Sequence, residues 1–267
     1  MSRKKSPKKK PRKSKPCPEC QGQGVVIEEC MNCMGHRCLE CDGQGYIVSD
    51  CEHCSETRAK ESEKFRKNEE KDAAKKALKK EMSKPGSTTF EQQGLVFNYI
   101  AETDLLDIIK MLAKPSVCEF VFFGPNTEQE TRSYFEPLVE SIQTAIEKKE
   151  RPTEHVFTIR KDGIFVGQCA LLPIAFSPGN FLIGFTIDDD YWQQGIGERA
   201  CRFLIHFAFH ALNARRISGD CMEGNIGSRK IMEKCGFRFE GTQKKYWSKN
   251  GKIYDNLLFG LLKGQQR

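Results

Sequence analysis

The segment 183–212 constrains the fold most, because it reads as a strand, a glycine-containing turn and a long helix in direct succession. Ile183, Phe185 and Ile187 alternate with other residues at the two-residue period of a strand. After the turn, apolar residues recur every three or four positions, which predicts a helix. The turn itself, residues 193–197, reads Gln-Gln-Gly-Ile-Gly. A strand, glycine turn and helix in this order form an anion site, because amides at the helix N-terminus lack internal partners.

The spacing in this turn separates it from two common phosphate-binding loops. It is neither GxGxxG, the dinucleotide-binding pattern, nor GxxxxGK[ST], the pattern of P-loop NTPases. The short Gln-Gln-Gly-Ile-Gly form resembles the pyrophosphate loop of the GNAT superfamily of N-acetyltransferases, which bind acetyl-coenzyme A. Taken alone, the same pattern also fits an ordinary strand–helix turn.

A second motif lies downstream, in residues 225–241, which read NIGSRKIMEKCGFRFEG. It resembles the RimJ/RimL-type branch, the acetyltransferases of ribosomal-protein N-termini, in which an N-x-x-S helix leads into E-K-x-G-F and then E-G. The pairs Tyr191-Trp192 and Ala208-Phe209 also resemble that branch. The resemblance covers roughly residues 94–263, about two thirds of the chain. It implies an α/β fold, a mixed sheet flanked by helices, and acetyl-CoA-dependent transfer to an amine.

The resemblance also implies roles for individual residues. The backbone of residues 185–187 would hold the pantetheine arm and polarise the thioester, and amides of the glycine turn would bind the pyrophosphate. Ser228 would stand near the sulfur as proton donor, on the same helix face as Asn225, and these two are the expected catalytic residues. Helix capping is the alternative role for both, because Asn is a favourable N-cap residue. The expected acetyl-CoA-binding residues are Phe185, Thr186, Ile187, Gln193, Gln194, Gly195, Ile196, Gly197 and Asn225.

Two positions depart from the family pattern. Many acetyltransferases of the superfamily have a tyrosine acid where this chain has Met232, and the RimJ/RimL type often has a glutamate where it has Leu182. The sequence therefore assigns no general base. Glu154, His155 and Asp188 lie near expected strand ends, and we interpret them as surface residues. An acceptor amine can also arrive already neutral through water.

The segment 17–54 contains an internal repeat, because CPECQGQGVVIEECMNC (17–33) and CLECDGQGYIVSDCEHC (38–54) align residue for residue. Each copy has a CxxC pair, a GxG, a short Val/Ile-containing stretch and a second CxxC pair. Two thiolates from one CxxC turn fill two corners of a zinc tetrahedron, and a hairpin that returns a second pair fills the others. The expected ligands of two structural zinc ions are Cys17, Cys20, Cys30, Cys33, Cys38, Cys41, Cys51 and Cys54.

This cysteine-rich ribbon is similar to the corresponding region of DnaJ-type chaperones, where the outer CxxC pairs share one zinc and the inner pairs share the other. The second and fourth pairs lack the GxG here, and the spacers are short, so one zinc per repeat remains an alternative. Seven acidic residues against one basic residue make the ribbon a poor ligand for nucleic acid. We interpret it as a docking module for a protein partner.

Charge is distributed unevenly along the 267 residues. Residues 1–90 hold 21 Lys/Arg and 14 Asp/Glu, whereas residues 91–267 hold 22 of each. The segment 1–16 has nine Lys/Arg and no acidic residue, which predicts a disordered basic arm. Such an arm binds phosphate backbones without sequence preference, so RNA or a ribosome is one expected partner and a solubilising tail is the alternative.

The pattern predicts four parts in order along the chain. They are the basic arm (1–16), the zinc ribbon (17–54), a charged helical linker (55–90) and the acetyltransferase domain (91–267). In the last part, glycine, proline and the hydrophobic period predict strands at 95–100, 154–161, 163–174, 180–187, 217–221, near 237 and at 254–262, and helices at 104–113, 128–148, 196–212 and 225–235. The five cysteines of this part lie in apolar or mixed runs and are expected to be small core residues.

We therefore expect an N-acetyltransferase that modifies a protein N-terminal α-amine and docks on a partner through its zinc ribbon. Two alternatives are a small-amine acetyltransferase, for a polyamine or an antibiotic, and a zinc-ribbon adaptor whose GNAT domain binds coenzyme A without turnover. Thirteen cysteines without a secretory signal favour a cytoplasmic, reducing environment. No apolar run approaches the roughly 18 residues of a membrane span, so no membrane association is expected.

Overall fold

A computed structural model describes residues 25–29, 46–50, 52–84 and 86–265 of the chain. The chain divides into two compact units, Met1–Ala73 and Ala74–Arg267. The expected basic arm and the expected zinc ligands Cys17, Cys20, Cys30, Cys33, Cys38, Cys41 and Cys51 lie outside the described residues.

The first unit contains β1 (Val25–Glu29), β2 (Tyr46–Asp50) and most of α1 (Glu52–Met82). Each cysteine repeat contributes one strand, and the two strands pair with each other in antiparallel register. This arrangement differs from the expected hairpin inside each repeat, because the Val/Ile stretch of one repeat makes a single five-residue strand.

The helix α1 confirms the helix expected in the charged segment that follows the ribbon. Its exposed face carries i,i+4 ion pairs such as Glu56–Lys60 at 3.2 Å, which stabilise a helix that has no apolar stripe. Cys54 lies in its first turn.

The second unit is built on an eight-stranded sheet with the order β3-β4-β5-β6-β7-β8-β10-β9. All neighbouring strands are antiparallel except β7 and β8, which are parallel. The strands are β3 (Thr89–Gln92), β4 (Leu95–Tyr99), β5 (His155–Lys161), β6 (Ile164–Pro173), β7 (Asn180–Ile187), β8 (Arg216–Met222), β9 (Arg238–Lys249) and β10 (Lys252–Leu262).

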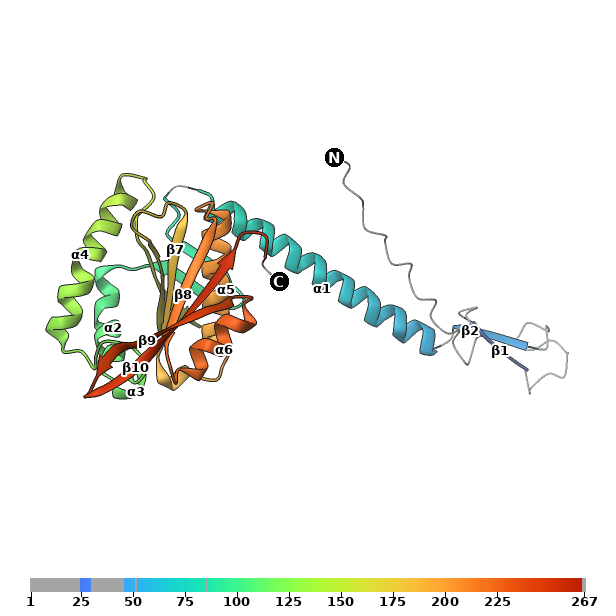
Figure 1. The fold of residues 1–267 in the computed structure, drawn as a ribbon. Coiled ribbons are helices and arrows are strands. Elements are labelled where there is room, and N and C mark those ends of the chain that lie inside the picture. The colour runs from blue at the N-terminus through green and yellow to red at the C-terminus, as the bar shows by residue number, and fades with distance from the viewer. Residues whose placement is uncertain (1–24, 30–45, 51, 85, 266–267) are drawn as a thin grey trace, which may run out of the picture. The chain divides into compact units, whose positions relative to one another are not determined.

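Helices cover both faces of this sheet, as Figure 1 shows: α2 and α4 lie on one side and α5 and α6 on the other. The elements of the first face are η1 (Glu102–Asp104), α2 (Leu105–Leu112), α3 (Pro115–Cys118) and α4 (Glu128–Glu147). After β7 come η2 (Asp189–Tyr191) and α5 (Ile196–His210), and α6 (Ile226–Lys234) follows β8. The expected mixed sheet flanked by helices is confirmed.

The core lies between the sheet and α5. Phe203 of α5 stacks on Phe97 of β4 with ring centroids 3.9 Å apart, and Phe207 packs edge-on against Phe157 of β5. Phe90 of β3 joins this aromatic group and is 2% exposed. The apolar residues of α5 recur on the face that packs here, which is why this segment forms a helix.

The parallel contact between β7 and β8 is short, and this feature positions the site. The two strands pair at three positions, from Asn180 opposite Arg216 to Leu182 opposite Ser218. Beyond Leu182, β7 continues for five residues without pairing to β8, and its other edge stays bonded to β6. Among the helices that the structure describes, none has the length and apolar character that a membrane span requires.

Candidate active site

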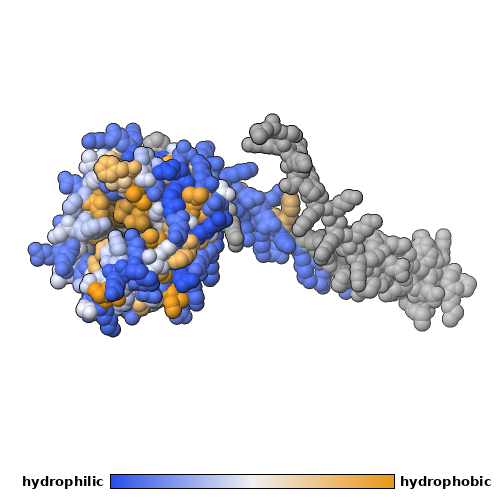
Figure 2. All heavy atoms as spheres, in the orientation of Figure 1, coloured by the Kyte–Doolittle hydropathy of each residue, from blue (hydrophilic) through white to orange (hydrophobic). Residues whose placement is uncertain are grey.

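A groove of about 1140 Å³ lies where β7 and β8 separate. Its lining comes from both faces of the sheet: α5 and α6 on one side, and α4 with the loop after α3 on the other. Figure 2 shows apolar atoms gathered between α2 and the sheet, with hydrophilic atoms around them. The groove is therefore a largely apolar passage through the opened sheet, which is the kind of site that binds small molecules.

The glycine turn stands at one end of this groove, before α5. Gly195 is the N-cap residue of α5 and has a φ of 71°, a left-handed conformation that glycine adopts without strain. Gly197 lies in the first turn, where an added Cβ would meet Ile231 of α6 at 2.8 Å. Glycine at this position lets α5 pack closely against α6 and β7. The first-turn amides of α5 have no partner within the helix, so this turn is suited to an anion.

The structure brings most of the predicted residues together. Gln194 is the exception, because its side chain accepts a hydrogen bond from Lys161 Nζ at 3.0 Å and lies outside the groove lining. Its carbonyl accepts a bond from Arg199 at 3.3 Å, which fastens the turn. The predicted residues that line the groove are Phe185, Thr186, Ile187, Gln193, Gly195, Ile196, Gly197, Asn225 and Ser228.

Asn225 and Ser228 lie where β8 ends and α6 begins. Asn225 is the N-cap residue of α6, and its Oδ1 accepts a hydrogen bond from the Ser228 backbone amide at 3.0 Å. The capping alternative therefore describes what the Asn225 side chain does in this structure. Both residues are half-buried and face the groove.

The two positions that depart from the family pattern also line the groove. Met232 is 1% exposed and Leu182 is half-buried. At Leu182 the chain offers an apolar side chain where the RimJ/RimL type often has a carboxylate. Neither residue can exchange a proton.

An aromatic loop, residues 119–123, borders the groove on the α2–α4 face. Phe122 stacks on Trp247 of β9 with ring centroids 4.7 Å apart. Lys249 Nζ donates hydrogen bonds to the carbonyl oxygens of Val121 at 2.7 Å and Phe123 at 2.8 Å, and also to that of Cys118. Burial lowers the pKa of this ammonium. One charge on the β9–β10 hairpin thus fixes the backbone of the loop.

A second cation fastens the segment that leads into the glycine turn. Lys114 Nζ donates hydrogen bonds at 2.8 Å to each of Asp188, Asp189 and Asp190. Burial opposes its charge, but these bonds raise the pKa of Lys114 overall. The same ammonium and the Ser116 hydroxyl lower the pKa of Asp189 to about 2. The three carboxylates are therefore occupied by a lysine.

Sequence reasoning missed three polar residues of the groove. Asp220 lies on β8, Asn256 on β10 and Gln168 on β6. The sequence of β8 contained a signal, because Asp220 is the acidic residue of the strand candidate 217–221.

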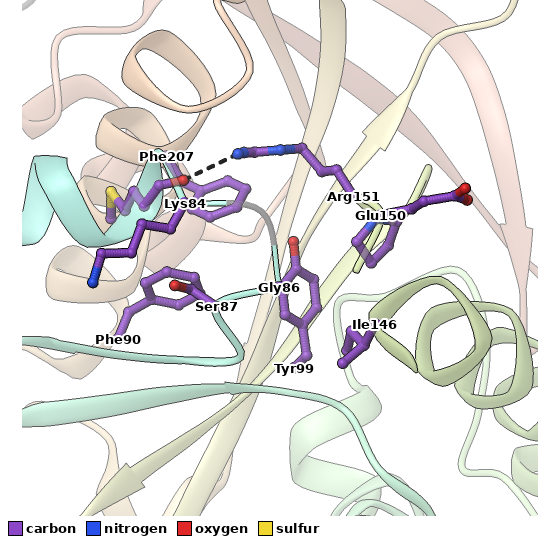
Figure 3. Close-up of a pocket in the computed structure, with 11 residues that line it drawn as sticks. Lys84, Gly86, Ser87, Phe90, Tyr99, Ile146, Glu150, Arg151 and Phe207 are labelled. Carbon is purple, nitrogen blue, oxygen red and sulfur yellow. Dashed lines mark hydrogen bonds between the residues drawn. The ribbon is translucent and has the colours of Figure 1, made fainter. Parts of the chain in front are cut away.

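His155 corrects another interpretation. It was expected at the surface, but it is 2% exposed, and its Nδ1 lies 2.6 Å from the Tyr99 hydroxyl. Tyr99 also lines a small cavity of about 10 Å³, where Arg151 donates a hydrogen bond to the Met82 carbonyl oxygen at 3.3 Å. Figure 3 shows Arg151 and Tyr99 at this cavity. That cavity holds no more than a water molecule.

The cysteines of the second unit confirm the expectation that they are small core residues. The five cysteines of the second unit are all buried: Cys118, Cys169, Cys201, Cys221 and Cys235. Burial raises the pKa of Cys221 to about 11, so this thiol stays protonated in the groove wall. His206 and His210 lie on the outer surface of α5, half-buried and exposed respectively.

Solved structures of similar fold are acetyltransferases. The ribosomal-protein-S5-alanine acetyltransferase from Vibrio fischeri matches with a TM-score of 0.57 and 21% identity, covering 67% of this chain and 99% of that one. Spermidine N-acetyltransferase from Vibrio cholerae, solved with CoA and spermine, matches with a TM-score of 0.55 and 18% identity, covering 65% and 98%. At these identities the likeness shows the fold.

The family follows from the sequence match. The model of the acetyltransferase (GNAT) domain matches residues 95–238, more than half of the chain, so this chain belongs to the GNAT acetyltransferases. It is 29% identical over 152 residues to the probable N-acetyltransferase YjcK of Bacillus subtilis, which covers 51% of this chain and 84% of the relative. It is 36% identical over 102 residues to the putative ribosomal N-acetyltransferase YdaF of the same organism, covering 38% and 56%.

Proposed function

We propose that this chain is an acetyl-CoA-dependent N-acetyltransferase whose acceptor is the α-amine of a protein N-terminus. The observation that carries the proposal is the groove that passes through the opened sheet. It joins the glycine turn on the α5–α6 face to the aromatic loop on the α2–α4 face. A thioester and an amine can therefore approach each other from opposite sides of the sheet.

The described residues fit acetyl-CoA. The β7 edge from Phe185 to Ile187 is unpaired toward β8 and can bond an extended ligand containing amides. The amides of Gly195 to Gly197 stand free at the N-terminus of α5 for a pyrophosphate. Bound acetyl-CoA supplies an activated acetyl group.

Ser228 is the proposed proton donor of the site. It sits in the first turn of α6 with its backbone amide capped by Asn225, so its position is fixed by the cap. Ser228 lines the groove, so its hydroxyl can protonate a leaving thiolate there.

A panel of acceptors tests this proposal. The zinc-loaded protein would be incubated with acetyl-CoA and with Ser-, Ala- and Thr-starting peptides, spermidine and an aminoglycoside, and the products would be weighed by mass spectrometry. We expect a mass increase of one acetyl group on a peptide α-amine. Acetylated spermidine without acetylated peptide would select the small-amine alternative, for which the structural likeness to a spermidine acetyltransferase speaks. Coenzyme A binding without any transfer would select the adaptor.

We also propose that the ribbon binds two zinc ions, with the outer CxxC pairs sharing one and the inner pairs the other. The register of β1 and β2 supports this pairing. Val25 lies opposite Asp50, and in the sequence one outer pair precedes Val25 and the other follows Asp50. Glu29 lies opposite Tyr46, and in the sequence one inner pair follows Glu29 and the other precedes Tyr46. Such closed sites would be structural.

Zinc counting separates the two pairings. Changing Cys17, Cys20, Cys51 and Cys54 together to serine removes both outer pairs. We expect the purified variant to retain one zinc per chain by atomic emission, against two for the wild type. If each repeat held its own zinc, this variant would lose both ions.

The ribbon and the basic arm are proposed to serve substrate capture in the cytoplasm. The acidic ribbon suits a protein partner, and the arm suits RNA or a ribosome. Removal of residues 1–73 is then expected to raise the KM of a full-size substrate and to leave the coenzyme A Kd unchanged. An unchanged KM would contradict the docking role.

A further inference from the structure

Three polar residues of the groove share one face of the sheet. An added Cβ on Gly219 would meet Met232 of α6 at 2.9 Å, so Gly219 faces α6 and the next residue, Asp220, faces the α2–α4 side. The β8–β10 register places Asn256 opposite Met222, two residues after Asp220 and hence on its face. Gln168 of β6 lies opposite Thr186 of β7, and Thr186 shares a face of β7 with Leu182. Leu182 lies opposite Ser218, which shares a face of β8 with Asp220, so Gln168 lies on that face of the sheet too.

The hydrogen bonds fix which way the Asn256 amide points. Its Nδ2 donates to Asp220 Oδ2 at 3.0 Å and to Gln243 Oε1 at 3.0 Å. A carboxylate only accepts, so the NH₂ end must face Asp220. Asn256 is 2% exposed, and its Oδ1 is buried without a hydrogen-bond partner, as is Gln168 Oε1. Buried polar atoms are rarely left unpaired, so these two oxygens point to a missing donor.

The surroundings select the chemistry of that donor. The charged side chains that line the groove from the α2–α4 face are Glu119 and Asp220, both acidic. Lys234, the cation of the lining, belongs to α6 on the opposite face. Phe122, Phe135 and other apolar side chains form the rest of this wall. An apolar wall with a carboxylate and two amide oxygens favours a hydrogen-bond donor and disfavours an anion.

We propose that Asp220, Asn256 and Gln168 form the acceptor subsite of the groove and that it takes a primary amine. This inference rests on the proposed acetyltransferase function and names the residues that recognise the acceptor. A neutral primary amine has two N–H groups, which can donate hydrogen bonds to the oxygens of this subsite. The lone pair of the nitrogen then stays free to attack the thioester. An acetylated amine keeps one N–H and is bulkier, so the subsite also favours product release. Asn256 acts as a positioning residue, because it holds Asp220 through Nδ2.

The test measures binding and turnover separately. Asp220→Asn removes the charge with little change of shape. Asp162→Asn, in the exposed turn between β5 and β6, is the matched control. Gln168→Met is a second variant that leaves the bond between Asp220 and Asn256 intact. Calorimetry would give the Kd of coenzyme A and of a Ser-starting peptide on the coenzyme A-loaded protein, and steady-state kinetics would give the KM and kcat of the amine.

We expect Asp220→Asn to raise the peptide Kd and the amine KM by about ten- to a hundredfold, the range for a hydrogen bond to a charged group. The coenzyme A Kd of Asp220→Asn stays within about twofold of the wild type. The peptide Kd and the amine KM of Asp162→Asn do so too. Gln168→Met raises the amine KM by about three- to tenfold, as a neutral hydrogen bond would. The same peptide with an acetylated N-terminus binds at least about tenfold more weakly than the free amine.

The outcomes separate this inference from the proposed function. A wild type that binds the free peptide amine through Asp220 but transfers no acetyl group refutes the function and keeps the subsite. A wild type that transfers acetyl, with Asp220→Asn and Gln168→Met both unchanged in KM, overturns the subsite and keeps the function. Equal binding of free and N-acetylated peptide also overturns the subsite. Neither binding nor transfer with any acceptor overturns both.

Discussion

His155 is a neutral imidazole built into the core of the second unit. Burial, with a smaller contribution from the positive charge of Arg151, lowers its pKa to about 3. The Tyr99 hydroxyl lies 2.6 Å away, and burial raises the pKa of that phenol, so both partners are uncharged at neutral pH. The pair bridges β4 and β5 beside Phe207.

The depressed pKa makes stability depend on pH. The unfolded chain protonates this imidazole near pH 6.5 and the folded chain only near pH 3, so the stabilisation is complete above 6.5 and is lost as pH falls. We expect the free energy of unfolding to fall by up to about 1.4 kcal/mol per pH unit below 6.5 through this residue. Urea titrations at pH 7.0, 6.0 and 5.0 measure this dependence. In His155→Gln the free energy of unfolding is expected to fall less steeply with pH than in the wild type. The same change at the exposed His210 is expected to alter the slope less.

Two substitutions on α6 separate catalysis from capping. Ser228→Ala removes the proposed proton donor but keeps the capped backbone amide. We expect kcat to fall by about a hundredfold or more with unchanged stability. Asn225→Ala removes the cap and is expected to lower stability by about 1 kcal/mol. Stopped assays and thermal melts of both variants check this, and an unchanged kcat in Ser228→Ala would assign the residue a structural role.

At the scale of elements, the hydrophobic period predicted β7 and the start of α5 at the residues where the structure has them. Among the elements that escaped it is β3, and the strand expected near 237 marks only the start of β9. β3 is four residues long, and one of its two buried residues is the polar Gln92, so its period is too short to recognise. β9 runs for 12 residues as the outermost strand, and its exposed, lysine-containing surface hides the strand pattern.

The candidate site was predictable where local sequence fixes geometry. The glycine turn and the pair Asn225 and Ser228 are local motifs, and the structure brings them to one groove. Asp220 and Asn256 were not predictable, because their proximity depends on the register of β8 with β10. Alternation tells which residues share a face, but it does not tell which face opens into a groove.

The contact between α3 and η2 yields a test at this scale. Lys114→Met leaves Asp188, Asp189 and Asp190 without their shared ammonium, just before the glycine turn. We expect repulsion among the carboxylates to shift η2 and to weaken coenzyme A binding by about two- to tenfold. Calorimetry measures this effect, and Lys110→Met, at an exposed position of α2, is the matched control. Equal affinities in both variants would contradict a role for this contact.

At the scale of the whole molecule, the boundary between the two units falls inside α1. The end of α1 belongs to the second unit, where Met82 is 1% exposed, and Phe90 packs between Phe157 and Phe207. A fragment that begins at residue 74 retains both side chains, and one that begins at residue 91 loses both.

We expect the fragment 74–267 to melt cooperatively, with a coenzyme A Kd close to that of the full chain. The fragment 91–267 is expected to be destabilised by several kcal/mol, because each large buried side chain removed costs about 2–5 kcal/mol. Thermal melts monitored by near-ultraviolet circular dichroism compare the two. Equal midpoints would show that α1 and β3 contribute little to the core.

The short parallel contact between β7 and β8 is the place where two sets of strands join in the sheet. Strands β3 to β7 form one set and β8, β10 and β9 form the other, and three residue pairs between β7 and β8 connect the two sets. A ligand bound in the groove contacts both sets of strands and therefore stabilises their association. Occupancy at a hundred times the Kd adds about 2.7 kcal/mol to the folded state. The stability of this enzyme therefore depends on the concentration of its own cosubstrate, and the ligand-free protein unfolds more readily.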